Sequence, residues 1–221
     1  MNGQVSLGTS RQTLAALGKY FVCTNPTAGS AIGFANNVAY SATDNGLFSI
    51  ANSAPSGGPN IQLDRLKLIQ TAAAPANGLY SRMEIVQETG IVVLSGNAAA
   101  RTPVNINLAY TNATNATVMS FATGAGTVPG AVGTRRIIGV LSLASGVNVR
   151  YDSWTVEFGA DGPVNGTVGL TAARATDPAD LVFSAPPVTI APQTSAWINL
   201  WGIAPDTNVP SYEWCLGWSE V

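Results

Sequence analysis

The C-terminal part of the chain contains a stretch in which side chains alternate strictly in size. Large apolar residues stand at Tyr212, Trp214, Leu216 and Trp218, and small or polar residues stand between them. Because successive side chains of a β-strand point to opposite faces, this pattern predicts a strand with one buried face. Burying each such side chain is worth roughly 1.5 to 3 kcal/mol. We therefore expect loss of this stretch to prevent folding.

Similar short apolar runs recur along the chain, and clusters of Gly, Pro, Asn and Asp separate them. Asn45-Gly46 and Asn77-Gly78 are typical of hairpin turns. Such spacing is typical of sandwiches and barrels, and helical periodicity is nearly absent. The sequence predicts an all-β fold, an antiparallel β-sandwich, with strands at 47–51, 61–71, 79–87, 91–95, 104–110, 117–122, 136–143, 154–158, 167–171, 181–183, 188–190, 196–202 and 212–218.

The N-terminal part of the chain differs from the rest in composition. Residues 1–45 mix Gly, Ser, Thr, Asn and Ala with a few apolar anchors, notably Tyr20 and Phe21. A short helical turn is expected from Arg11 to Leu17, and Gly18 ends it. We interpret residues 1–45 as an extended N-terminal arm and residues 46–221 as a single β-sandwich domain.

Charged residues are scarce. They make up 10% of the chain, whereas hydrophobic residues make up 46%, and about 25% charged residues is usual for soluble domains. A surface that is polar but carries few charges protects a monomer poorly against association. The composition therefore favours a protein whose surface is covered by copies of itself or by other subunits.

The sequence does not favour nucleic acid or membrane as a partner. The formal net charge is −2, and the basic residues are scattered singly except for Arg135-Arg136, so no basic stripe could follow a phosphate backbone. No run of about eighteen apolar residues is present, and the first residues lack the pattern of a signal peptide. We expect a soluble protein made in the cytoplasm.

No pattern of catalytic or cofactor-binding residues is found. The chain has no histidine, which removes the commonest general base and metal ligand. Two acidic pairs, Glu84 with Glu88 and Asp177 with Asp180, could contribute oxygen ligands to a divalent ion, but solvated acids explain them more simply. We predict no catalytic residue, no metal site and no cofactor, and therefore no enzyme.

The two cysteines, Cys23 and Cys215, are far apart in the sequence and match neither metal-ligand nor CxxC spacing. We interpret them as buried free thiols. A disulfide joining the arm to the last strand is the alternative, which a cytoplasmic site of assembly disfavours.

Two further groups of residues each allow two interpretations. The five tryptophans could stack on sugar rings, but all of them occupy alternating strand positions, which favours a core or subunit interface. Arg135 and Arg136 precede an apolar run and could form a basic rim for a neighbouring subunit or simply a solvated strand start.

Four segments together resemble small β-sandwich virion proteins of double-stranded DNA bacteriophages. They are GKYFVCTNPT (18–27), IQLDRLKLI (61–69), RTPVNIN (101–107) and YEWCLGW (212–218). The similarity is spread over most of the chain, and no single motif is diagnostic. It implies a jelly-roll-like subunit, usually a homotrimer, that builds a viral capsid or acts as a decoration or cement protein between capsomers.

This resemblance also implies partners and a location. The partners would be other copies of the chain and the major capsid protein or other shell subunits, and the protein would reside in the virion after assembly in the host cytoplasm. Repeated weak contacts around a symmetric shell would supply the stability. Candidate contact residues are Tyr20 and Phe21 on the arm and Arg135 and Arg136 on the body.

Two rival functions remain open, because sandwiches host many functions. A carbohydrate-binding or receptor-binding module of a phage particle predicts exposed aromatic residues on one sheet face. A carboxylate-based glycan hydrolase predicts two acids that face each other in a cleft.

Overall fold

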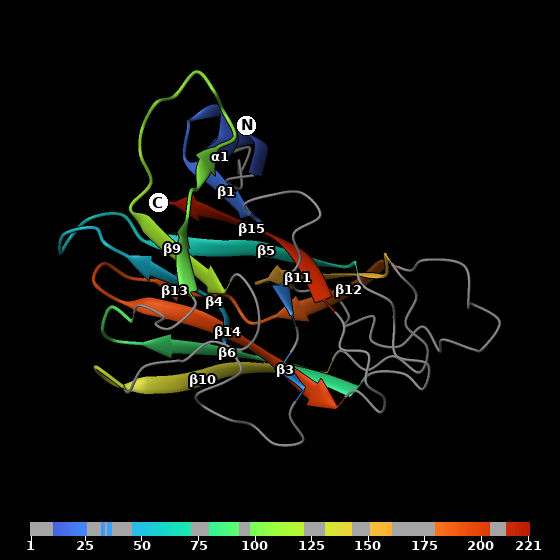
Figure 1. Ribbon diagram of the computed structural model, residues 1–221. Coiled ribbons are helices and arrows are strands. Elements are labelled where there is room, and N and C mark those ends of the chain that lie inside the picture. The colour runs from blue at the N-terminus through green and yellow to red at the C-terminus, as the bar shows by residue number, and fades with distance from the viewer. Residues whose placement is uncertain are drawn as a thin grey trace, which may run out of the picture.

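We describe the protein from a computed structural model. The structure describes residues 11–25, 32–33, 35–36, 46–71, 80–92, 98–121, 131–142, 151–160, 180–203 and 211–221. These residues form one short helix and two β-sheets that pack face to face (Figure 1). The all-β sandwich predicted from the sequence is confirmed.

The first sheet, sheet A, has the strand order β12-β11-β5-β15-β1-β8, with β13 paired to β5 and β2 paired to β15. Its strands are β1 (Tyr20–Thr24), β2 (Ile32–Gly33), β5 (Ile61–Gln70), β8 (Val104–Asn105), β11 (Ser153–Phe158), β12 (Asp180–Ala185), β13 (Thr189–Ile190) and β15 (Ser211–Glu220). All pairs are antiparallel except β11 with β12.

The second sheet, sheet B, has the order β10-β6-β14-β4-β9-β7, with β3 paired in parallel to β14. Its strands are β3 (Ala35–Asn36), β4 (Gly46–Asn52), β6 (Tyr80–Glu88), β7 (Ala98–Arg101), β9 (Ala116–Phe121), β10 (Arg135–Ser142) and β14 (Ser195–Ile203). The chain crosses between the sheets from β4 to β5 to β6 and again from β13 to β14 to β15, as it does in double-sheet jelly rolls.

The core lies between the inner faces of the two sheets. In β15 the alternating residues Tyr212, Trp214, Leu216 and Trp218 are buried, as the sequence predicts. Trp214 stacks on Phe48 of β4 with ring centroids 5.2 Å apart, which joins sheet A to sheet B. Because β15 also pairs with both β5 and β1, it holds the centre of sheet A.

Most predicted strands are present, but the segment 104–110 differs. Only Val104–Asn105 forms a strand, β8, and the rest turns. The side-chain oxygen of Asn105 accepts a hydrogen bond from the Asn107 amide, and that of Asn107 accepts one from the Ala109 amide. These local bonds compete with strand pairing and bend the backbone.

Two other predicted strands are not found among the described residues. Ile91 and Val92 are not in a strand, and residues 93–95 lie outside the described part, as does the whole of 167–171.

Part of the predicted N-terminal arm, residues 20–24, forms β1 of sheet A. Residues 20–24 do not lie apart from the sandwich: β1 is paired on one side with β15 and on the other with β8. Tyr20, Phe21 and Cys23 are buried. The preceding helix, α1 (Arg11–Ala16), ends before Gly18, whose φ of 66° suits glycine. The division of the whole chain at residue 45 stays a prediction.

Candidate interaction surfaces

Two of the four predicted contact residues, Tyr20 and Phe21, are inside the protein. Tyr20 is 4% exposed, and its hydroxyl donates a hydrogen bond of 2.5 Å to Asp64 of β5. Burial and this bond raise the pKa of Tyr20 above its ordinary value. Phe21 stacks on Trp218 with centroids 6.1 Å apart. Pairing of β1 with β15 therefore buries both residues, and neither side chain lies on the surface where a neighbour would contact it.

The other two predicted residues, Arg135 and Arg136, begin β10 and point to opposite faces of sheet B. Arg135 pairs across the sheet with Glu88, and its Nε lies 2.8 Å from the Glu88 carboxylate. Its guanidinium also lies 4.5 Å from the ring centroid of the buried Trp197, close enough for a cation–π contact. Arg136 pairs with Gln87 and is exposed. Arg135 is therefore held by contacts within the sheet, whereas the side chain of Arg136 is exposed to solvent.

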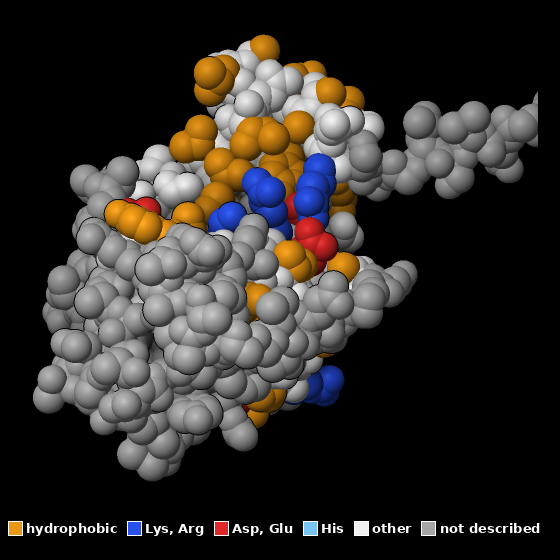
Figure 2. All heavy atoms as spheres, turned by 90° about the vertical axis from the view of Figure 1, so that its right-hand side faces the viewer, with side chains coloured by type: hydrophobic (Ala, Val, Ile, Leu, Met, Phe, Trp, Pro, Cys, Tyr) orange, Lys and Arg blue, Asp and Glu red, His pale blue; other side chains and the backbone are white. Residues whose placement is uncertain are grey.

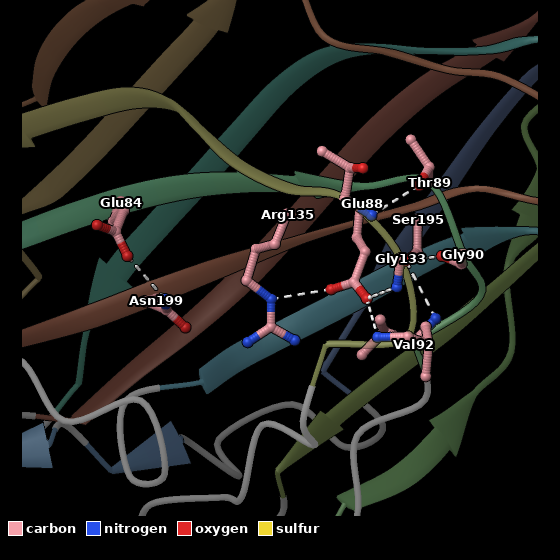
Figure 3. Close-up of polar contacts among 11 residues, drawn as sticks. Glu84, Glu88, Thr89, Gly90, Val92, Gly133, Arg135, Ser195 and Asn199 are labelled. Carbon is pink, nitrogen blue, oxygen red and sulfur yellow. Dashed lines mark hydrogen bonds and ion pairs between the residues drawn. The ribbon is translucent and has the colours of Figure 1, made fainter.

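Glu88 organises the corner where β6 ends and β10 begins (Figure 3). Besides the ion pair, its carboxylate accepts hydrogen bonds from the backbone amides of Val132 and of Gly133, the latter at 2.8 Å. The side chain is fully buried. A buried carboxylate is stable only when it is paired and hydrogen-bonded, and here both conditions hold. We call Glu88, Arg135 and the residues 131–134 the Glu88 corner.

Ser195 of β14 secures the adjacent turn at 89–92. Its hydroxyl donates to the carbonyl oxygen of Gly90 at 2.6 Å and accepts from the amide of Val92 at 3.1 Å. Figure 3 shows these bonds beside those of Glu88. Polar side chains of sheet B therefore fix both connecting segments of this corner.

The acidic pair Glu84 and Glu88 is not a shared ion site. The two residues are on the same face of β6, but four positions at about 3.3 Å per residue place them roughly 13 Å apart. Glu84 accepts a hydrogen bond of 3.0 Å from the Asn199 amide, and Glu88 has the partners given above. Both are buried, not solvated as expected. Asp177 and the side chain of Asp180 lie outside the described residues, within which no acidic or cysteine cluster could hold a metal.

An apolar surface lies at the end of the molecule that carries α1. Its residues are all exposed and come from the position just after α1, from β8 and from the segment after β8: Leu17, Val104, Ile106, Leu108 and Tyr110. We call this set the α1–loop surface. Leu108 is 87% exposed. Figure 2 shows hydrophobic side chains gathered at this upper end of the molecule, where Figure 1 places α1.

Polar bonds hold the α1–loop surface in one shape. The Asn107 side-chain amide donates to the carbonyl oxygens of Ala15 and Ala16 at 3.2 and 3.3 Å. The Asn105 amide donates to the Gly18 carbonyl oxygen at 2.7 Å. A Cβ on Gly18 would lie 2.3 Å from the Tyr110 ring, so the ring rests directly on this glycine. The loop and the helix are thus one unit.

Helix α1 is also attached to sheet A. The Arg11 guanidinium lies 2.7 Å from Asp64, the same carboxylate that accepts the Tyr20 hydroxyl. Because Arg11 is about half exposed, this ion pair contributes little on its own. Its position nevertheless fixes the direction of the helix relative to β5.

Sequence reasoning missed the α1–loop surface because it treated 104–110 as a strand. The available signal was the spacing of Asn105 and Asn107 around Ile106. Asn side chains at this spacing favour local turns over strand pairing, so an apolar residue between them need not be buried.

The four tryptophans whose side chains the structure describes do not form the exposed platform that a sugar-binding face requires. Trp154, Trp197, Trp214 and Trp218 are each at most 2% exposed. The side chain of Trp201 lies outside the described residues. The interpretation of these four as core residues is confirmed.

The two cysteines are on opposite faces of sheet A. Cys23 is opposite Leu216 in the β1–β15 pair, whereas Cys215 is opposite Thr24. Both are free thiols, Cys23 buried and Cys215 partly exposed. Burial raises the pKa of Cys23 to about 12 and also raises that of Cys215. The interpretation as free thiols is confirmed, although only Cys23 is fully buried.

Comparison with known proteins gives no family assignment. No family model, no curated protein and no solved structure matches the chain. In the described part of the chain, no helix has the length and apolar character needed to cross a bilayer.

Proposed function

We propose that this protein is a structural subunit of a virus particle, a capsid decoration, cement or coat subunit, that associates with copies of itself through the α1–loop surface. The observation that carries the proposal is the exposure of apolar side chains on a segment fixed by hydrogen bonds. Leu108 is the most exposed of them.

The energetics of this surface favour a partner. Apolar area removed from water contributes about 25 cal/mol per Å², and a contiguous exposed apolar patch is typical of an interaction site. The surface already has its shape before binding, so association requires little further ordering. Apolar side chains on an unanchored segment would contribute less binding free energy, because association would also have to order that segment.

A second copy of the chain is the partner that fits best. None of the five residues is charged, so two or three copies of the surface can meet around a symmetry axis without repulsion between like charges. Only 10% of the whole chain is charged, so the surroundings of the surface oppose association weakly. Contacts repeated around a closed ring then add up.

The viral part of the proposal rests on the resemblance of four segments to phage virion proteins. It adds a second partner, the major capsid protein or other shell subunits, and the virion as the location. A carbohydrate-binding module is less favoured, because the four described tryptophan side chains are in the core.

The solution mass of the purified protein tests self-association. Light scattering coupled to size exclusion, at several concentrations, is expected to give a trimer or larger assembly. Leu108→Asp should shift the mass to that of the 22.7 kDa chain. A matched control is Val182→Asp, on the opposite edge of sheet A, which should keep the assembly. A wild-type monomer at all concentrations would refute the proposal.

The viral assignment has its own test. The wild-type protein should sediment with undecorated phage capsids and Leu108→Asp should not. If the wild-type protein self-associates but does not bind capsids, the proposed decoration role is refuted. The proposed self-association is not affected by that result.

A further inference from the structure

A hollow lies between the end of β6, the start of β10 and the segment that leads from β13 to β14. It has a volume of about 250 Å³. The side chains and backbone that line it belong mainly to hydroxyl-bearing residues and one cation: Gln87, Thr89, Thr134, Arg136, Thr189 and Thr194. This volume is below the roughly 300 to 1,000 Å³ of sites for drug-sized ligands. The hollow therefore suits a small ligand or one group of a larger one.

The charge of this hollow is positive. Its one acidic residue is Glu88, whose carboxylate is fully buried and engaged by Arg135 and by two backbone amides. Arg136 points to the opposite face of the sheet from Arg135. In the described part of the chain no hydrogen bond or ion pair is found for the Arg136 guanidinium. Among the described residues, no acidic side chain therefore neutralises its charge.

The neighbouring hydroxyl groups complement this charge. The Thr89 hydroxyl oxygen accepts a hydrogen bond of 2.8 Å from the Thr134 amide, which leaves its own hydrogen to be donated. Gln87 is fixed by a bond of 2.8 Å from its amide to the Thr189 carbonyl oxygen. The Thr194 hydroxyl donates to the Ala191 carbonyl oxygen at 2.8 Å and can accept from a ligand. The walls are therefore held in place and offer both donors and acceptors.

We infer that this hollow binds the oxyanion group of a small ligand, a carboxylate or a phosphate. The planar fork of an arginine matches either group in a two-point hydrogen bond. Threonine hydroxyls supply further donors and can accept from hydroxyls of the ligand. This inference is independent of self-association, because the hollow and the α1–loop surface have no residue in common.

Saturation-transfer NMR with the full-length protein tests carboxylate binding, with sodium glucuronate as the probe and glucose as its neutral counterpart. Line broadening in ³¹P NMR tests inorganic phosphate. Binding of one or both anions below about 10 mM is expected, and it should weaken as the salt concentration rises. Glucuronate binding alone assigns a carboxylate site, and phosphate binding alone assigns a phosphate site.

Three variants locate the binding. Arg136→Gln should weaken it at least about tenfold, because hydrogen bonds to a charged group are worth roughly 1.5 to 3 kcal/mol. Arg136→Lys should retain part of it. Arg65→Gln, which removes an exposed arginine of β5, is the matched control and should retain all of it. Circular dichroism would confirm that each variant is folded.

Three outcomes would overturn the inference. They are no binding of either anion, equal binding of glucose and glucuronate, and equal weakening by Arg136→Gln and Arg65→Gln.

Discussion

The Glu88 corner and the α1–loop surface use the same kind of bond for opposite purposes. In both, polar side chains bind backbone groups of a connecting segment and hold it in place. At the Glu88 corner the polar groups are buried and bind one another. At the α1–loop surface the polar groups are beneath the loop and the apolar side chains face outward. The first arrangement stabilises the fold, and the second holds apolar side chains at the surface, where we propose that a second copy of the chain binds.

The largest effect on stability is expected from Glu88→Ala. It removes the carboxylate that pairs with Arg135 and leaves two backbone amides without their acceptor. Breaking a buried ion pair in this way costs about 3 to 5 kcal/mol, which urea unfolding would measure. The matched control is Glu157→Ala, whose contact with Arg11 is 3.6 Å long and partly exposed; it should cost less than about 0.5 kcal/mol. Equal costs for the two variants would contradict a stabilising role for this corner.

A smaller effect is expected from Asn107→Ala at the α1–loop surface. The variant loses two donated bonds to the end of α1 and one accepted bond. We expect a loss of about 1 to 2 kcal/mol in unfolding free energy and a lower assembly mass. Asn112→Ala, at an exposed loop position, should change neither quantity. An unchanged assembly mass in Asn107→Ala would show that the hydrogen bonds between Asn107 and α1 are not needed for self-association.

The burial of β1, the strand that comes next after α1, can be tested through pH, because it carries Cys23. Cys23 has an ordinary pKa near 9 when unfolded and about 12 when buried. The unfolded chain therefore ionises first as pH rises, and stability present below pH 9 is lost above it. Between pH 8 and 10 the wild type should lose about 1 kcal/mol more than Cys23→Ala in urea unfolding. No difference would indicate that Cys23 is open to solvent.

The smallest effect on stability is expected from Leu108→Ala, because this side chain is almost fully exposed. The unfolding free energy measured at concentrations where the chain is monomeric should change by less than about 0.5 kcal/mol, while the assembly mass falls. Leu66→Ala, which removes a fully buried leucine of β5, should cost about 2 to 5 kcal/mol. A large loss for Leu108→Ala would place this residue in the core and not in an interface.

Local patterns in the sequence predicted many of the strands but not which strands pair with one another. The alternation in 212–218 and 154–158 predicted β15 and β11 and their buried faces, because side-chain direction repeats every two residues. The position of β1 was not predictable in this way, since its pairing with β15 joins residues from distant parts of the sequence. The buried location of Tyr20 and Phe21 follows from that pairing.

The candidate sites were predictable only in part. The sequence singled out Arg135 and Arg136 as contact residues, a role that stays a prediction, and alternation puts their side chains on opposite faces. The burial of Glu84 and Glu88 carries no local signal, because it depends on what covers the outer face of sheet B. The α1–loop surface was not predicted, because the alternating apolar residues of 104–110 are typical of a strand. The side chains of Asn105 and Asn107 are the signal for a turn.

The place of β15 at the centre of sheet A has a consequence for synthesis in the cell. Because β5 and β1 have no direct pairing and meet only through β15, sheet A cannot close before residues 211–220 have left the ribosome. Until then the apolar faces of the earlier segments stay exposed to solvent. Such exposure slows folding and favours binding by chaperones. Chains interrupted before this strand would also lack the support of β1, the strand on which α1 is seated. Synthesis itself would thus select which molecules can join an assembly.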